Sequence, residues 1–264
     1  MEQPIFVLDQ ASFGYQSDQP LVQELNLLIY PRESVVILGA NGSGKSTLLK
    51  LISGLLYLSR GRIAAFGTEL NEKNLQMEDF NRAFRQKVGF VFQNSDAQLF
   101  SATVWDEVAF GPLQLGLNPE DVKLRVEETL ALLGIANLAT RPPYRLSGGE
   151  KKKVAIACVL AVNPEVLLLD EPTNGLDPRT QRWLVELLVS LRQAGKTIIT
   201  ATHDLSIVEE IADRVIIFNE AHQLAADGKP QELLLNRQLL LDVNLIHERS
   251  HFHILGQTSH AKHL

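Results

Sequence analysis

The segment SVVILGANGSGKST, residues 34–47, constrains the fold of this chain more than any other feature. It joins an apolar run to a glycine-rich stretch that matches the pattern G-x-x-x-x-G-K-[ST]. Such a pattern predicts a buried strand, a tight loop and the start of a helix. Glycines let backbone N–H groups curl around phosphate oxygens, and the helix N-terminus adds a favourable dipole. The segment therefore predicts a phosphate-binding loop.

The loop supplies most of the candidate nucleotide ligands. We expect the Lys45 ammonium to reach the β- and γ-phosphates and the Ser46 hydroxyl to bind Mg²⁺. The alternative is an incidental glycine turn, but strand, loop, lysine and hydroxyl all fit the phosphate-binding pattern. The other candidate ligands of this loop are Gly39, Asn41, Gly42, Ser43, Gly44 and Thr47.

Two adjacent carboxylates end a second apolar run, EVLLLDE, at residues 165–171. Asp170 is placed to hold Mg²⁺, directly or through water, and Glu171 to orient or deprotonate an attacking water. The alternative is a solvated strand end. Together with the phosphate-binding loop, this pair predicts a nucleoside triphosphatase that uses Mg²⁺.

The pattern of apolar residues predicts an α/β fold. Several runs are continuously apolar, as expected for parallel strands covered on both faces, and segments with helical periodicity separate them. The first thirty residues alternate like antiparallel strands that end at Pro31, and helical signals dominate between about 95 and 160. A terminal hairpin is followed by a short helix that starts near Pro230. The apolar runs cover residues 34–39, 88–93, 165–171, 196–203 and 214–218.

Composition excludes several classes of function. A net charge of −6 gives no support for a nucleic-acid partner. The single cysteine, Cys158, precludes an intramolecular disulfide and fits a reducing compartment. The N-terminus lacks the features of a signal peptide, and no apolar run approaches the roughly 18 residues of a membrane span. If the protein acts at a membrane, we expect another chain to supply the spans.

A second anion-binding motif lies at residues 146–150, LSGGE. Ser147, Gly148 and Gly149 place exposed N–H groups and a hydroxyl at a predicted helix N-terminus. With the sequences FGY, FVFQNS, NGLD and ATHD in the expected order, the chain resembles the ATP-binding cassette (ABC) ATPases over nearly its full length.

This resemblance implies a fold, a domain organisation and the cofactors ATP and Mg²⁺. The expected fold is α/β, a P-loop NTPase (RecA-like) core with an N-terminal antiparallel β subdomain and a helical ABC insert. Residues 1–228 would form the ATPase domain, with the helical subdomain at about 95–160. Residues 229–264 would form a short C-terminal helical extension with a histidine-rich tail.

The resemblance also assigns roles to single residues. Tyr15 would stack on adenine, and Gln93, as the Q-loop glutamine, would contact Mg²⁺ and act as a catalytic residue. His203 would contact the γ-phosphate, and Asp177 would lie across a dimer interface. A strand-end histidine is otherwise a structural or exposed residue, and NGLDP would otherwise be a turn before a helix at Pro178.

In this family the LSGGE-type motif of one subunit closes the ATP site of its partner across a two-fold axis. The expected partner is a second copy of the chain, because every catalytic motif is intact, or else a paralogous cassette. The chain departs from the common pattern at Glu150, where glutamine is more frequent. The lysines at 151–153 form either a solvated helix face or a surface for the membrane subunit or the dimer.

Residues 88–117 resemble the energy-coupling-factor importers, particularly the cobalt and nickel branch, although Ser95, Ala97 and Ala102 depart from that pattern. The resemblance implies a transmembrane coupling subunit, a substrate-binding membrane component and a peripheral position on the cytoplasmic face of the membrane. Phe100 and Val104 are predicted to be exposed apolar residues that contact the coupling subunit; the alternative is packing within the helical insert.

The favoured function is to energise an importer of cobalt or nickel ions. A vitamin importer and a soluble, non-transport ABC ATPase are the alternatives. The C-terminal histidines could bind a divalent metal ion, or they could belong to a flexible polar terminus. These residues are His247, His251, His253, His260 and His263.

Overall fold

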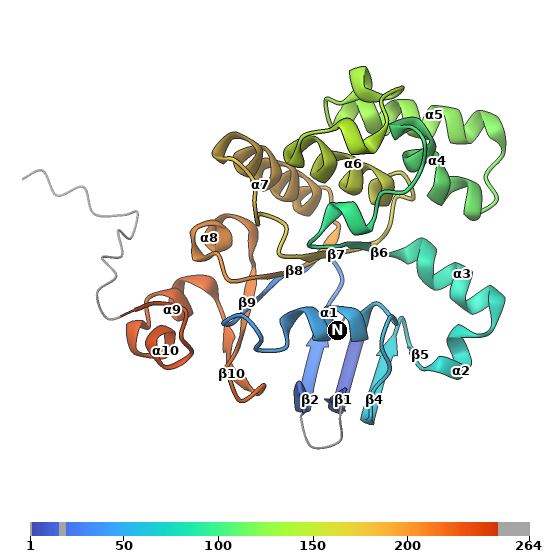
Figure 1. Ribbon diagram of the computed structural model, residues 1–264. Helices are drawn as coiled ribbons and strands as arrows, with labels where there is room; N and C mark the ends of the chain where they lie inside the picture. The colour runs from blue at the N-terminus through green and yellow to red at the C-terminus, as the bar shows by residue number, and fades with distance from the viewer. Residues whose placement is uncertain (1, 16–19, 248–264) are drawn as a thin grey trace, which may run out of the picture.

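The computed structural model describes residues 2–15 and 20–247, and within these it contains two β-sheets and a group of helices (Figure 1). The smaller sheet has the strand order β2-β1-β4-β5 and is antiparallel. Its strands are β1 (Phe6–Phe13), β2 (Val22–Ile29), β4 (Arg60–Ala65) and β5 (Thr68–Glu69). The two strands predicted in the first thirty residues are confirmed as β1 and β2.

The larger sheet has the order β10-β9-β3-β8-β7-β6, in which only β10 is antiparallel to its neighbour. Every residue of β3, β7 and β8 is buried, which explains why their sequences lack the alternation of a half-exposed strand. In β8, three of the six buried residues are threonines. The five apolar runs are thus confirmed as strands. They are β3 (Ser34–Leu38), β6 (Val88–Val91), β7 (Val166–Asp170), β8 (Thr197–Thr202) and β9 (Arg214–Phe218), with β10 at Leu224–Gly228.

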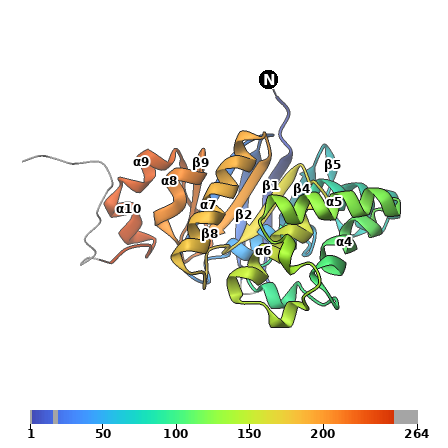
Figure 2. The same cartoon turned by 90° about the horizontal axis from the view of Figure 1, so that it is seen from above.

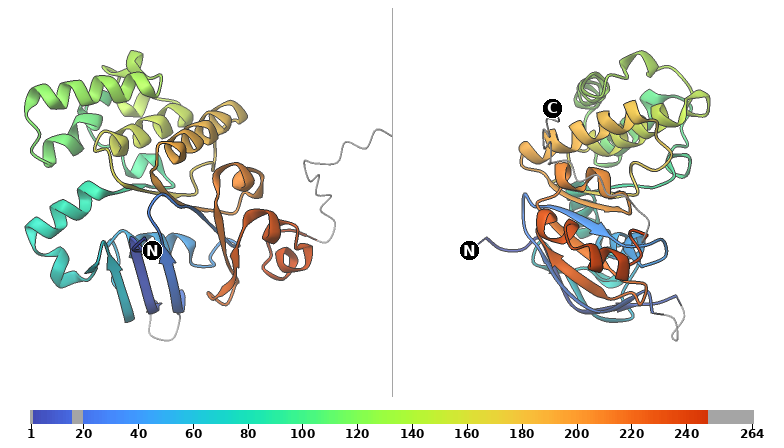
Figure 3. Two further views of the ribbon diagram at one scale, coloured as in Figure 1. Left: turned by 180° about the vertical axis from the view of Figure 1, so that it is seen from behind. Right: turned by 90° about the vertical axis from the view of Figure 1, so that its left-hand side faces the viewer.

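The two faces of the larger sheet belong to different cores, because successive side chains of a strand point to opposite faces. Val35 and Ile37 of β3 pack with α1 (Lys45–Ile52) and the antiparallel sheet. Val36 and Leu38 pack on the other face with the helices of the insert and with the helices that follow it in the chain. Figures 1 and 3 show this arrangement, with the antiparallel strands and the helical insert on opposite sides of the central strands.

The helical part between β6 and β7 consists of α4 (Val104–Gln114), α5 (Pro119–Leu132) and α6 (Gly148–Leu160). Each helix begins at a polar cap: the side chains of Thr103, Asn118 and Ser147 accept hydrogen bonds from first-turn N–H groups. Short 3₁₀ turns lie between these helices at η1 (Ser95–Ala97), η2 (Ala136–Leu138) and η3 (Pro143–Arg145).

The structure corrects one expectation in this region. Val104 is fully buried in the core of the helical part, so the prediction that it is exposed is wrong. Phe100 is exposed as predicted, and its ring packs edge-on against Phe110 at a centroid distance of 5.1 Å.

The remaining helices complete the layers, and Figure 2 shows α7 beside β8 in the view from above. They are α2 (Glu72–Leu75), α3 (Glu78–Lys87), α7 (Pro178–Gln193), α8 (Val208–Ile211), α9 (Pro230–Leu234) and α10 (Arg237–Asp242), with the 3₁₀ turn η4 at Leu205–Ile207. The predicted terminal hairpin is β9 and β10, and α9 starts at Pro230 as predicted. Among the described residues, no helix is both long enough and apolar enough to cross a membrane.

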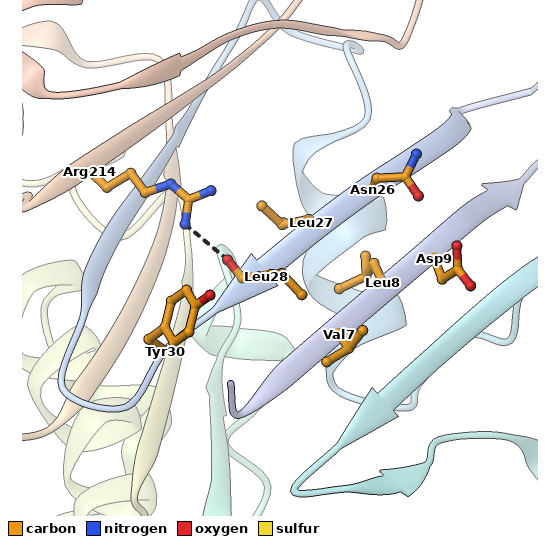
Figure 4. Close-up of a pocket in the computed structure, with 8 residues that line it drawn as sticks. All are labelled: Val7, Leu8, Asp9, Asn26, Leu27, Leu28, Tyr30 and Arg214. Atoms are coloured by element: carbon orange, nitrogen blue, oxygen red, sulfur yellow. Dashed lines mark hydrogen bonds between the residues drawn. The ribbon is translucent and has the colours of Figure 1, made fainter. Parts of the chain in front are cut away.

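Arg214 joins the two sheets (Figure 4). Its guanidinium donates to the backbone carbonyl of Leu28 on β2 at 2.9 Å and to both carboxylate oxygens of Asp227 on β10 at 2.6 Å. It also reaches Glu33 at 3.2 Å. Residues of β1 and β2 line the shallow pocket beside this contact, with Tyr30 at one end. The network fixes the antiparallel sheet against the larger one.

Candidate nucleotide-binding site

The glycine-rich loop connects β3 to α1 at the carboxyl edge of the larger sheet (Figure 1). Gly44 caps α1 with φ at 104°, and a Cβ atom there would overlap the carbonyl oxygen of Leu21. Only glycine fits this position. Because Gly44 carries no side chain to cap the helix, the first N–H groups of α1 are available to an anion.

A cavity of about 420 Å³ opens over this loop. Its size is that of a small-molecule site. Five separate parts of the chain contribute to it: the residue before β2, the glycine-rich loop, the segment after β6, the segment after β7 and the residue after β8. It is lined by Leu21, Asn41, Gly42, Gly44, Lys45, Ser46, Thr47, Gln93, Glu171, Asn174 and His203. The fold therefore brings most of the ligands predicted in the glycine-rich loop to one place with Gln93, Glu171 and His203. It adds Leu21 and Asn174, neither of which was predicted as a ligand.

Lys45 lies at the base of the cavity and is 5% exposed. Its ammonium donates to the carbonyls of Gly39 at 2.8 Å and Ala40 at 3.1 Å, and it lies 3.5 Å from a carboxylate oxygen of Glu171. Burial lowers the pKa of Lys45, and the nearby carboxylates of Glu171 and Asp170 oppose that shift. One buried ammonium group therefore lies at the base of the cavity, beside the N-terminus of α1.

Ser46 and Asp170 form a direct pair, in which the serine hydroxyl donates to the carboxylate at 2.6 Å. Asp170 is only 5% exposed, and burial raises its pKa, although the bond from Ser46 opposes the shift. A hydroxyl and a carboxylate oxygen beside a phosphate site form a donor set that suits Mg²⁺. Gln93 lines the same cavity and could supply a third oxygen.

Glu171 follows β7 in the left-handed backbone region, with φ at 43°, a conformation that is strained for a non-glycine residue. Its backbone N–H donates to the carbonyl of Ala201 on the neighbouring strand at 2.8 Å, which holds this turn in place. One carboxylate oxygen lies 2.9 Å from Nδ1 of His203. The predicted general base and the predicted switch histidine are therefore in direct contact.

The LSGGE motif begins α6 with a reciprocal cap. The Glu150 carboxylate accepts from the backbone N–H and the hydroxyl of Ser147, both at 2.8 Å, and the Glu150 N–H donates back to the Ser147 hydroxyl at 3.4 Å. These bonds from Ser147 lower the pKa of Glu150. Glu150, which stands where glutamine is more frequent, thus provides a carboxylate that caps α6 within its own chain.

The structure places the LSGGE motif away from the glycine-rich loop, in a second cavity of about 730 Å³. Asp177 lies in this cavity and caps α7: its carboxylate accepts from the N–H of Arg179 at 3.0 Å and from the hydroxyl of Thr180 at 2.6 Å. The lining includes Ser147, Gly148, Gly149, Glu150, Lys153, Asp177, Arg179, Thr180 and Trp183. Within one chain, the two helix ends that were predicted to bind anions therefore line different cavities.

Tyr15 is not among the residues that line the first cavity. It is 65% exposed, and its ring packs edge-on against Phe13 at a centroid distance of 5.1 Å.

The expectation that the three lysines at 151–153 form a solvated face is wrong for Lys152, which is 3% exposed. The described residues contain no cluster of three or more histidine, cysteine, aspartate or glutamate side chains that could hold a metal ion. The tail histidines from 251 onward lie outside the described residues.

A parallel sheet with a phosphate-binding loop, a hydroxyl–carboxylate pair and a buried glutamate at its carboxyl edge defines a P-loop nucleoside triphosphatase. Comparison with known proteins identifies the family within this class to which the chain belongs. The family model described as ABC transporter matches residues 22–174. The nickel import ATP-binding protein NikO of Rhodobacter capsulatus is 47% identical over 246 residues, which cover 92% of this chain and 96% of that protein.

Two solved structures share the fold. CbiO1 of Clostridium perfringens, titled part of the ABC transporter complex cbiONQ, is 37% identical with a TM-score of 0.79, covering 92% of this chain and 96% of that one. The ATP-binding cassette MJ0796, titled a dimeric post-hydrolysis state bound to ADP and Pi, is 29% identical with a TM-score of 0.77, covering 85% and 98%. The chain belongs to the ABC transporter family, as an ATP-binding and ATP-hydrolysing subunit, and the predicted fold class is confirmed.

Proposed function

We propose that this chain is the ATPase subunit of an energy-coupling-factor type importer for nickel or cobalt ions. The ATPase part is supported by one observation: a single cavity is lined by Lys45, Ser46 and the Glu171–His203 pair. The carboxylate of Asp170 adjoins it through its hydrogen bond with Ser46. The importer and its solute are supported by the likeness to a nickel import ATP-binding protein and to CbiO1.

The residues of the cavity divide the chemistry of hydrolysis among them. The backbone of the glycine-rich loop and Lys45 bind the phosphates, with Lys45 exchanging its present carbonyl partners for phosphate oxygens. Glu171 accepts a proton from the water that attacks the γ-phosphorus, while the bond to the β-phosphate oxygen breaks and ADP leaves. His203 orients Glu171 through their 2.9 Å contact.

Mg²⁺ bound by Ser46, Asp170 and Gln93 would neutralise phosphate charge. The oxygen donors present fit this ion, because the hydroxyl and the buried carboxylate lie 2.6 Å apart at the edge of the phosphate site.

The second anion site requires a partner. Ser147, Gly148 and Gly149 line a cavity without the glycine-rich loop of their own chain, so they would meet the triphosphate bound by another copy. We favour a homodimer, because both halves of the site are intact in this chain; a paralogous cassette would supply the same groups. The likeness to MJ0796, solved as a dimer, supports this arrangement.

The membrane partners would meet the helical part of the chain. Phe100 is 70% exposed, Phe110 is 44% exposed, and Leu113 is 52% exposed on the same helix as Phe110. The buried carboxylate of Glu107 accepts from the N–H groups of Phe100 and Ser101 and so holds this loop in place. An exposed apolar cluster of this kind suits a transmembrane coupling subunit, itself joined to a substrate-binding membrane component, on the cytoplasmic face of the membrane.

The variant Glu171→Gln tests the ATPase mechanism, because the amide keeps the size of the buried side chain but cannot accept the proton. With ATP and Mg²⁺, phosphate release should fall by about a hundredfold or more, and an ATP-dependent dimer should appear in gel filtration. Glu128→Gln, on the exposed face of α5, is the matched control and should hydrolyse ATP at the wild-type rate. An unchanged rate in Glu171→Gln would exclude the proposed role.

Mass spectrometry of the proteins that co-purify with this chain from solubilised native membranes tests the transport assignment. A transmembrane coupling subunit with a metal-type substrate component would support it. A vitamin-type component with a second cassette would overturn both the solute and the homodimer. Ribosomal or DNA-bound partners would overturn the importer.

A further inference from the structure

Lys152 is a buried cation that the proposed chemistry does not use. Its side chain points inward from the second turn of α6 and is 3% exposed. The ammonium donates to the backbone carbonyls of Gln93 at 2.9 Å and Phe92 at 3.2 Å. Burial lowers the pKa of Lys152, and the charge of Asp170 opposes the shift. A buried ammonium is costly unless hydrogen-bonded, so these carbonyls are essential partners.

Two further contacts tie the same stretch to α6. Gln98 accepts from the N–H of Phe92 at 3.2 Å and donates to the carbonyl of Ala155 at 2.8 Å. At the surface, the Lys151 ammonium lies 2.6 Å from the Asp96 carboxylate. The segment 92–98 is thus attached to α6 at three points, and Figure 1 shows α6 above the ends of β6 and β7 in that view.

This connection joins two segments that line different cavities: the segment that contains Gln93 and the LSGGE helix, α6. Gln93 lines the first cavity, and Ser147 lies at the N-terminus of α6 in the second. Among the described residues, no side-chain hydrogen bond fixes the amide group of Gln93, so its position depends on its backbone. That backbone is what Lys152 holds.

We infer that Lys152 is a positioning residue for Gln93, and that its ammonium makes the Gln93 segment and the LSGGE helix move as one unit. The inference rests on the proposed function for what Gln93 binds. When Gln93 engages Mg²⁺ at the bound nucleotide, α6 would follow, and the LSGGE motif would be aligned for the partner subunit. Neither surface role expected for the lysines at 151–153 accounts for Lys152.

Amide hydrogen exchange of the nucleotide-free chain tests the connection without any turnover. The N–H groups of Ala97, Gln98 and Leu99 donate to the carbonyls of Asn94 and Ser95, so their exchange reports on the order of this segment. In Lys152→Met, which keeps the aliphatic length but removes the donor, exchange at residues 92–99 should rise by about tenfold. Exchange in β8 should not change, which separates local loosening from global destabilisation.

Lys123→Met is the matched control, because Lys123 is exposed on α5. It should leave exchange at residues 92–99 at the wild-type rate. If Lys152→Met does not fold, Lys152→Gln takes its place: the shorter amide keeps a donor, and exchange should rise by about threefold. Equal exchange in the wild type and in the folded Lys152 variant would overturn the inference.

Steady-state kinetics then separate positioning from nucleotide binding. In Lys152→Met, kcat should fall by about tenfold, because small displacements of a positioned group cost rate. The Kd for ATP without Mg²⁺ should stay within about twofold of the wild type, because the glycine-rich loop is untouched. An unchanged kcat, or a loss confined to ATP binding, would overturn the inference. If the wild-type protein does not hydrolyse ATP, the proposed function is wrong. The hydrogen-exchange experiment then still tests whether Lys152 orders residues 92–99.

Discussion

Replacement of Gly148 by alanine should separate what this chain needs for its own fold from what it needs for a partner. Gly148 is the first residue of α6, its backbone is helical, and a Cβ atom built on it meets no other atom within 4 Å. In the next residue, Gly149, a Cβ atom would lie 2.9 Å from the hydroxyl oxygen and 3.3 Å from the methyl carbon of Thr180. Two adjacent glycines thus differ in what surrounds them.

The magnitude follows from helix propensity. Alanine is favoured over glycine by about 1 kcal/mol in a helix interior, and about half of that is expected in the exposed first turn. Gly148→Ala should therefore raise the free energy of unfolding by about 0.5 kcal/mol and the melting temperature by about 1–2 °C. Gly149→Ala should be neutral or destabilising, because Thr180 must move.

Dimerisation and ATP hydrolysis should decrease in Gly148→Ala, although the stability of the fold increases. The new methyl group projects into the second cavity, over the N–H groups that are proposed to meet the phosphate bound by the partner subunit. ATP-dependent dimerisation of Gly148→Ala in gel filtration, and its phosphate release, should both fall by about tenfold or more. A destabilised Gly148→Ala would mean that the fold itself requires this glycine. A stable variant with full turnover would mean that the second cavity does not meet nucleotide.

Other predictions concern stability and thiol reactivity. Arg214→Met breaks the half-buried network with Asp227 and should lower the free energy of unfolding in urea by about 2–3 kcal/mol, whereas Arg182→Met, at an exposed ion pair, should cost less than about 1 kcal/mol. Equal losses in the two variants would refute this reasoning. Burial raises the pKa of the Cys158 thiol, so native protein should react with iodoacetamide at pH 8 about a hundredfold more slowly than denatured protein. Comparable rates would show that this segment opens readily.

The sequence alone determined the features that depend on local chemistry. The continuous apolar runs predict buried parallel strands, because a strand covered on both faces has no solvent-facing positions. The glycine-rich loop and the helix start at Ser147 are predictable because each is marked by the residue types of a few neighbouring positions. The strand β4 was not anticipated: its first three residues are exposed, and its extended form depends on pairing with β1.

Tertiary structure decided which way otherwise similar residues face. Phe100 and Val104 are only four residues apart, yet the first is exposed and the second is buried in the core that includes residues of α5 and α6. Lys151, Lys152 and Lys153 are adjacent, but only Lys152 turns inward, toward carbonyls about 60 residues earlier in the chain. Burial is set by which distant segments pack against a position, and that depends on the whole fold.

The same reason explains why the two predicted anion-binding motifs line different cavities. Each motif was evident as a short pattern, and each pattern predicts its own loop or helix end. Their separation within one chain follows from where β3 and α6 lie in space, which no local pattern encodes. The sequence by itself therefore predicted two anion-binding helix ends, and the tertiary structure decided that they line different cavities.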